Sequence, residues 1–222
     1  RKIFLKMNNF FNELNSLQKF KKSNEQIKVI ERKKPISAES FFRKLNKLPF
    51  SIYGNVSQEN TNSDIMELLK EVIPEKIQYD PFYGYWLEDM SEVCKLFCSF
   101  KGEDNISFWL GSKRGCTRYH VDMVPYRLLV TYDGQGTEIL PDEAANRNAF
   151  INGKSNEEIV KYNSAHWFID QWDVAIFRGG EKGILHRTPD SASNESSSVL
   201  MRLDGSSFFK EIEEVNKVIL SN

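Results

Sequence analysis

Three side chains have the types and the spacing that suit a metal ion. His120 and Asp122 stand two positions apart, and residues i and i+2 of an extended segment project to the same side. His186 follows Asp122 by 64 positions and ends a short strand-like run. Two histidines and one carboxylate form a facial triad, which is typical of non-haem Fe(II) sites and leaves coordination positions open for oxygen chemistry. The spacing therefore predicts a metal site, with a structural role for these residues as the alternative.

Few other residues are candidates for binding near this set. The chain has only three histidines, and the third, His166, is either a substrate-binding residue or an ordinary one. Arg118 and Arg187 flank the metal candidates and can meet an anionic substrate, because a guanidinium group binds carboxylates and phosphates through paired hydrogen bonds. Glu138 is a candidate partner for a ligating histidine, although a Glu after a glycine turn is commonly solvated.

The candidate ligands fall in the half of the chain that is rich in short strands. Apolar residues at helical spacing predict helices in the first hundred residues, and alternation between turn residues predicts strands after Ile106. The predicted helices cover residues 1–22, 37–48, 65–72, 87–100, 156–161 and 206–220, and the predicted strands cover 106–111, 126–132, 137–140, 167–169, 174–178, 183–187 and 198–203. This order of elements predicts one α+β domain with a helical first half and a β-barrel or sandwich.

Composition is that of a globular protein. The 222 residues carry a formal charge of -1, which gives no overall electrostatic reason for a nucleic-acid or membrane partner. The first fifty residues, however, hold 13 Lys or Arg and 4 Asp or Glu. Their apolar residues recur at helical spacing, so we interpret these charges as the solvated face of amphipathic helices. Salt-dependent binding of nucleic acid through the basic helices is the alternative.

Apolar runs and cysteines bear on the compartment. No apolar run approaches the roughly 20 residues that span a bilayer, and the first residues lack the apolar core and cleavage site of a secretory signal. Cys94, Cys98 and Cys116 are an odd number of cysteines without a paired framework. These features predict a cytoplasmic protein in a reducing compartment.

The sequence around the candidate ligands resembles a bacterial family of unknown function. Its members carry the block C-x-R-[FY]-H-V-D-x-V-P-x-R-L-L, a G-T-E turn and a later H-R-[ST]-P, which correspond here to residues 116–129, 136–138 and 186–189. The resemblance covers roughly residues 89–204 and leaves the basic first fifty outside. More broadly, the layout is similar to the double-stranded β-helix of Fe(II)- and 2-oxoglutarate-dependent oxygenases.

The resemblance implies a fold and a set of ligands. Residues 1–100 would form a mostly helical region packed on a jelly-roll or cupin-like barrel, a double-stranded β-helix. Residues 101–222 would form that metal-binding core and end in a C-terminal helix, all within one α+β structural domain. His120, Asp122 and His186 would hold Fe(II), while 2-oxoglutarate and dioxygen fill the open positions for oxidation of an unknown small molecule or macromolecule.

The sequence departs from that resemblance in one respect, which is the cation that binds the far carboxylate of 2-oxoglutarate. Those oxygenases carry an Arg or Lys shortly after the distal histidine, whereas residues 194–198 hold none. Arg202 and Arg127, with Tyr132, are the candidates for binding the cosubstrate, and ion pairs elsewhere are the alternative for the arginines. Arg127 and Tyr132 lie on opposite faces of a regular strand, so both cannot line one cavity. A cupin-like zinc protein without oxygenase activity, either a hydrolase or a metal-homeostasis factor, therefore also stays open.

Overall fold

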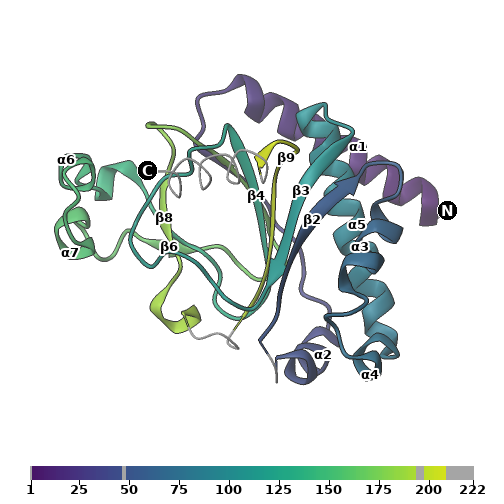
Figure 1. The fold of residues 1–222 in the computed structure, drawn as a ribbon. Coiled ribbons are helices and arrows are strands. Elements are labelled where there is room, and N and C mark those ends of the chain that lie inside the picture. The colour runs from purple at the N-terminus through teal and green to yellow at the C-terminus, as the bar shows by residue number, and fades with distance from the viewer. Residues whose placement is uncertain (1, 47–48, 194–197, 209–222) are drawn as a thin grey trace, which may run out of the picture. The chain divides into compact units, whose positions relative to one another are not determined.

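The computed structural model describes residues 2–46, 49–193 and 198–208 (Figure 1). Two compact units divide the chain between them. The first unit holds Arg1–Asn24, Ile52–Trp109 and Leu203–Asn222, and the second holds Glu25–Ser51 and Leu110–Arg202. All three candidate metal ligands therefore belong to the second unit. A helical region over residues 1–100 with a metal-binding core over 101–222 stays a prediction.

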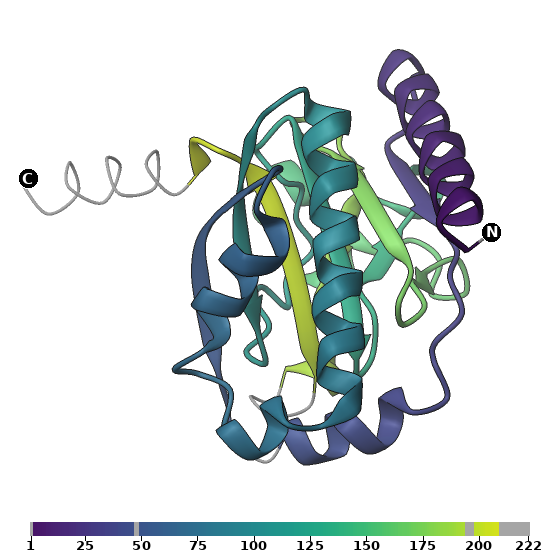
Figure 2. The same cartoon turned by 90° about the vertical axis from the view of Figure 1, so that its right-hand side faces the viewer.

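The first unit is mainly helical. It holds α1 (Lys2–Lys22), α3 (Thr61–Leu69), α4 (Glu75–Gln78), α5 (Pro81–Lys101) and most of strands β2 (Ser51–Ser57) and β3 (Asn105–Gly111). Helix α5 runs between α1 and α3 and packs against both (Figure 2). Its start is defined by the Asp80 carboxylate, which accepts the Phe82 N–H at 3.0 Å, and its end by Gly102 with a φ of 75°. Glycine adopts that left-handed conformation without steric cost.

The second unit carries most of the strands. Its elements are β1 (Ile27–Ile30), α2 (Ala38–Leu45), β4 (Tyr126–Asp133), β5 (Glu138–Leu140), α6 (Arg147–Ile151), α7 (Asn156–Ile159), β6 (Trp167–Phe168), β7 (Val174–Arg178) and β8 (Leu185–Arg187), with 3-10 turns at Asp142–Ala144 and Asp190–Ala192. Strand β9 (Val199–Gly205) begins in this unit, and its last residues belong to the first.

The strands of the second unit form two separate sheets. One has the order β1-β7-β4-β9 and the other the order β6-β5-β8, and the pairings β1 with β7, β4 with β7, β5 with β6 and β5 with β8 are antiparallel. Among the described residues no ladder joins the two sheets, so of the barrel and the sandwich that the sequence left open, a closed barrel is wrong. Strand length gives the reason, because β5, β6 and β8 have only three, two and three residues and pair within their own sheet. The jelly-roll assignment stays a prediction.

The two faces of β4 have different neighbours. Tyr132 stacks on Phe42 of α2, with ring centroids 6.3 Å apart, and meets Trp172 edge-on at 4.8 Å. Arg127 and Leu129 lie on the other face, toward the candidate metal ligands. Helix α2 therefore covers the side of this strand that faces away from the site.

Most predicted elements exist, with two strands missed. The helices predicted over 1–22, 37–48 and 87–100 correspond to α1, α2 and α5, and every strand predicted after Ile106 is present within a few residues. Strands β1 and β2 were not predicted. Strand β1 is hard to recognise because it is a four-residue, half-buried strand among charged residues. Most of the helix predicted over 206–220 lies outside the described residues.

In the described part of the chain, no helix has both the length and the apolar character needed to cross a bilayer.

Candidate metal centre

The two histidines of the predicted triad are held together by the backbone. His120 and His186 form an isolated antiparallel bridge and exchange two N–H to carbonyl hydrogen bonds, each 3.0 Å long. Residues paired in this way have Cα atoms about 5.5 Å apart and side chains on the same face. Their ring centroids accordingly lie 4.5 Å apart. The main chain therefore brings together two imidazoles that are far apart in the sequence.

Asp122 completes the group. One ligand atom from each of His120, Asp122 and His186 lies within 4.8 Å of the others, and Oδ2 of Asp122 is 3.4 Å from Nε2 of His186. Asp122 and His186 are each only 4% exposed. Nη1 of Arg127 contacts the other carboxylate oxygen, Oδ1. Among the described residues, Oδ2 is buried without a hydrogen-bond partner, as expected for an atom that accepts a ligand.

Backbone carbonyl groups orient both imidazole rings. Nδ1 of His120 is 3.0 Å from the Arg118 carbonyl oxygen, and Nδ1 of His186 is 3.0 Å from the Ile184 carbonyl oxygen. A carbonyl oxygen only accepts hydrogen bonds, so each Nδ1 carries the proton in the neutral ring. Each Nε2 therefore keeps its lone pair, which is the arrangement of metal-binding histidines.

The surroundings favour the ionisation states that bind a metal. Burial would raise the pKa of Asp122, but contact with His186 and the charge of Arg127 outweigh it and lower that pKa to about 2. Burial, followed by the neighbouring His186, lowers the pKa of His120. An anionic carboxylate beside a neutral imidazole is thus the stable state at neutral pH. Metal binding then requires few protons to be released.

A small cavity of about 130 Å³ adjoins these ligands. Pockets that hold drug-sized ligands measure roughly 300–1,000 Å³, so this one suits a small molecule. Four arginines are among its lining residues: Arg114, Arg127, Arg187 and Arg202. The chamber is therefore strongly cationic and favours an anion.

The predicted binding residues divide into two groups. Arg127, Arg187 and Arg202 line the cavity, whereas Arg118, His166 and Tyr132 are not among its lining residues. Arg118 instead donates to the carbonyl oxygens of residues 150 and 154, and the His166 ring meets Phe168 edge-on. The structure thus corrects the expectation for Tyr132, because the pleat of β4 turns that side chain toward Phe42 and Trp172.

Glu138 is buried and paired, contrary to the expectation of a solvated side chain. Its Oε2 accepts Nε of Arg187 at 2.8 Å, and its Oε1 accepts the hydroxyl of Tyr119. Burial and then Glu138 raise the pKa of Tyr119, so this hydroxyl stays a donor. Glu138 contacts neither imidazole in these bonds. It joins the segments that carry His120 and His186, whose chain neighbours are Tyr119 and Arg187.

Arg114 is the lining residue that sequence reasoning missed. It lies in the irregular segment between β3 and His120, where neither helical spacing nor alternation marks a residue as buried. The side chain is nevertheless only 6% exposed. The signal in the sequence that could have identified Arg114 is its position, two residues before the predicted ligand block.

Two glycines hold the Asp122 segment in place. The Gly180 N–H donates to the Asp122 carbonyl oxygen at 2.7 Å, and the Gly179 N–H donates to the Pro125 carbonyl oxygen at 3.1 Å. A Cβ atom at Gly179 would lie 1.8 Å from the Val124 carbonyl oxygen and 2.6 Å from that of Asp122. Only glycine permits this approach.

Gly179→Ala is therefore expected to displace Asp122 and to lower the affinity for Mn(II) about 10- to 100-fold, the range typical of groups that orient metal ligands. Calorimetric titration measures this, with circular dichroism to verify folding. Gly115→Ala is the matched control, because Gly115 lines the same cavity and a Cβ there meets no atom within 4 Å. Equal affinities in the two variants would contradict the role assigned to Gly179.

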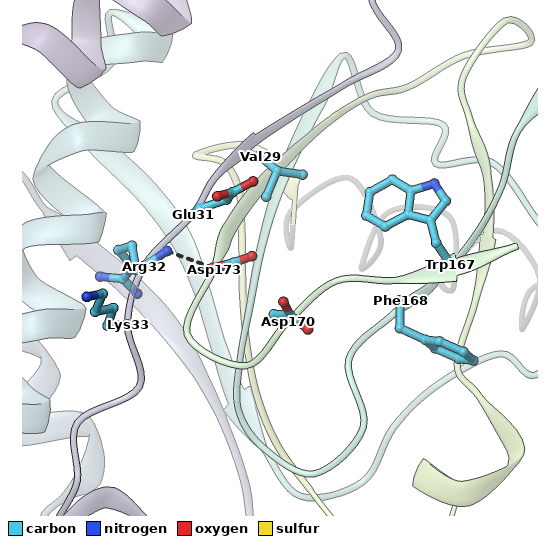
Figure 3. A pocket seen from close by; sticks show the side chains of 8 residues that line it. All are labelled: Val29, Glu31, Arg32, Lys33, Trp167, Phe168, Asp170 and Asp173. Carbon is cyan, nitrogen blue, oxygen red and sulfur yellow. Dashed lines mark hydrogen bonds between the residues drawn. The ribbon is translucent and has the colours of Figure 1, made fainter.

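A second, larger hollow of about 530 Å³ lies in the same unit (Figure 3). Its lining includes Val29 of β1 and Trp167 of β6, and Figure 3 shows Trp167 directed toward Val29 while Phe168 points away. Trp167 pairs with Ile139, which pairs with His186, so these side chains share a face of the small sheet. Ile139 is completely buried and lies between Trp167 and His186 in the register of this sheet.

The fold and the site define a protein of mixed helices and antiparallel sheets, with a His-Asp-His cluster able to hold a metal ion. The chain belongs to the family described as protein of unknown function, DUF1826, which matches residues 12–204. The match includes the whole cluster and confirms the resemblance to a family without an assigned reaction. It also reaches into the basic first fifty residues. No curated protein sequence matches the chain.

Comparison with solved structures finds two proteins of very different sequence at low TM-scores. One is described as selenomethionine-labelled Fe(II)/α-ketoglutarate-dependent dioxygenase TqaL; it is 10% identical, with a TM-score of 0.39, and the alignment covers 88% of each chain. The other is EvdMO1, which is 10% identical with a TM-score of 0.30, covering 82% of this chain and 56% of that one. The chain thus spans most of the first protein and a little over half of the second.

Proposed function

We propose that this protein is a non-haem Fe(II)- and 2-oxoglutarate-dependent oxygenase. The supporting observation is the set of three ligand atoms within 4.8 Å of one another beside a cationic cavity. Two histidines and one carboxylate are the donors of the facial triad, which binds Fe(II) and leaves three positions open. When bound, Fe(II) with 2-oxoglutarate supplies the activation of dioxygen for oxidation of a C–H bond.

The residues present fit such an ion. Oδ2 of Asp122 is a buried oxygen without a hydrogen-bond partner among the described residues. Its distance of 3.4 Å from Nε2 of His186 is close to the roughly 3 Å that separates adjacent donors when each lies about 2.1 Å from the same ion. His120, Asp122 and His186 would hold the metal, and the carbonyl oxygens behind the two rings would fix their orientation.

The chain's own contribution is positioning and exclusion of water. Arg127 holds Oδ1 of Asp122 and so directs Oδ2 to the metal. Phe177 covers the other side of His186, with ring centroids 4.6 Å apart. Arg202 lines the cavity and is a candidate for binding the cosubstrate. A small, cationic chamber would keep a bound 2-oxo acid ordered.

We extend the proposal to a fold of the double-stranded β-helix type. Its support is that Phe177 belongs to the larger sheet of the second unit and His186 to the smaller one, so the candidate metal site lies between two antiparallel sheets.

The test is an anaerobic titration with Fe(II) and 2-oxoglutarate. The proposal predicts the weak visible charge-transfer band of the chelate, followed on admission of oxygen by conversion of 2-oxoglutarate into succinate and carbon dioxide. One oxygen atom goes to succinate; because this assay contains no substrate, ascorbate is added to supply two electrons and two protons, and the other oxygen atom becomes water. Absence of both the band and succinate would reject the proposal.

A zinc protein is the second candidate. Three protein ligands with an open position also describe catalytic zinc sites, and residues 194–198 contain no cation for the cosubstrate. This alternative predicts one zinc per chain in protein purified from its own host, with no binding of 2-oxoglutarate. Metal analysis together with the anaerobic titration separates the two functions.

A further inference from the structure

Arg114 is a buried cation with unused hydrogen-bonding capacity. Its Nη1 donates to the Gln135 carbonyl oxygen at 2.9 Å, and its Nη2 donates to Oγ1 of Thr137 at 3.1 Å. Both acceptors are neutral. Its Nε–H is buried without a hydrogen-bond partner among the described residues. The side chain is 6% exposed and lines the metal cavity, so water competes little for this donor.

The charge of Arg114 also lacks a counter-ion within the described part of the chain. Two other cavity arginines are paired with carboxylates: Arg127 with Asp122 and Arg187 with Glu138. Burial lowers the pKa of Arg114, and no neighbouring acid opposes this effect. The guanidinium group still stays protonated at neutral pH. Buried charges are normally paired, so this arrangement is costly unless an anion binds.

We propose that Arg114 binds the carboxylate of a small dicarboxylic 2-oxo acid in the metal cavity. This rests on the proposed function, because the metal would take the other end of the same ligand. A guanidinium group binds a carboxylate through two parallel N–H to oxygen bonds, and the unpartnered Nε–H of Arg114 supplies one donor. The anchor would thus precede the ligand block in sequence, far from the serine-rich stretch where a cation was expected.

Cavity size limits the class of ligand. A volume of about 130 Å³ equals that of roughly four water molecules at about 30 Å³ each. It has room for a short-chain dicarboxylate and is too small to enclose a nucleotide or a long acyl chain. The inference therefore commits to a short 2-oxo acid with a second carboxylate, and inorganic phosphate is the competing anion.

The experiment compares two ligands that differ in the far carboxylate. Binding of 2-oxoglutarate and of 2-oxopentanoate, which has the same five-carbon chain with a methyl end, is measured calorimetrically without oxygen, with and without Mn(II). Wild type is expected to prefer 2-oxoglutarate about 10- to 100-fold, the range for charge-assisted hydrogen bonds. Arg114→Gln is expected to abolish the preference while leaving Mn(II) affinity unchanged. Arg114→Lys keeps the charge without the planar fork and is expected to lose most of the preference.

Controls separate this inference from the proposed function. Arg147→Gln removes a half-buried arginine that pairs with Asp142 outside the cavity, and should keep the full preference. Failure of wild type to bind Mn(II) rejects the metal proposal alone, whereas Arg114 is judged by the ligand comparison with or without metal. Absence of a preference in wild type, its survival in Arg114→Gln, or phosphate binding as tightly as 2-oxoglutarate would each overturn the role of Arg114.

Discussion

His186→Ala is expected to lower the affinity for Mn(II) about 100- to 1,000-fold. Four-ligand zinc sites bind with about 10–16 kcal/mol, or roughly 3–4 kcal/mol for each ligand, and the variant loses one of three protein donors. The bridge to His120 consists of main-chain hydrogen bonds, so it survives the substitution. Calorimetric titration measures the affinity, and thermal unfolding without metal is expected to change much less than the metal affinity does.

His166→Ala is the matched control for this experiment. His166 is the remaining histidine, lies outside the cavity lining, and packs its ring against Phe168. Its removal is expected to leave Mn(II) affinity within about twofold. Asp122→Asn removes the charge with little change of shape and should weaken binding as His186→Ala does. Parental affinity in His186→Ala would show that the cluster is not the metal site.

The sequence was sufficient to predict that His120 and Asp122 lie together, because their local geometry is simple. Alternation along an extended segment puts them on one side, and neither His166 nor His186 has a carboxylate two positions away. The bridge that joins His120 to His186 could not be predicted, since it depends on long-range pairing of irregular segments. Arg114 was missed for a related reason: its burial arises from tertiary contacts with Gln135 and Thr137, which no local pattern records.

The fold was predictable where a strand forms a continuous apolar run bounded by turn residues. Strand β7 was predicted with its observed bounds, because four of its five residues are fully buried. Strand β1 was missed, since its four half-buried residues become a strand only by pairing with β7. The order of short strands left a barrel and a sandwich equally open, because local patterns do not record which strands pair at the edges of a sheet. By contrast, the pleat of β4 predicted that Arg127 and Tyr132 would not both line the cavity. In the structure Arg127 lines it, and Tyr132 packs on Phe42.

Trp172 is the residue on which the far side of β4 depends. It is 1% exposed, meets Tyr132 edge-on at 4.8 Å and Phe42 at 6.4 Å, and has a φ of 73°. A non-glycine residue in that conformation is held there by its surroundings. Its N–H donates to the Thr131 carbonyl oxygen at 2.8 Å, and its own carbonyl oxygen accepts Nε of Arg32 at 2.6 Å. Both the indole ring and the backbone of Trp172 therefore stabilise this side of β4.

Trp172→Ala is expected to lower the free energy of unfolding by about 3–5 kcal/mol, as for other buried aromatic residues, with Mn(II) affinity unchanged. Urea denaturation and calorimetric titration measure the two quantities. Trp172→Gly loses the same contacts but relieves the left-handed backbone, which costs a non-glycine residue about 1–2 kcal/mol, an amount larger than the flexibility penalty of about 0.5–1 kcal/mol for glycine. Glycine is therefore expected to be the less damaging replacement, the reverse of the usual order. A more stable alanine variant would show that the indole contacts alone, without backbone strain, account for Trp172.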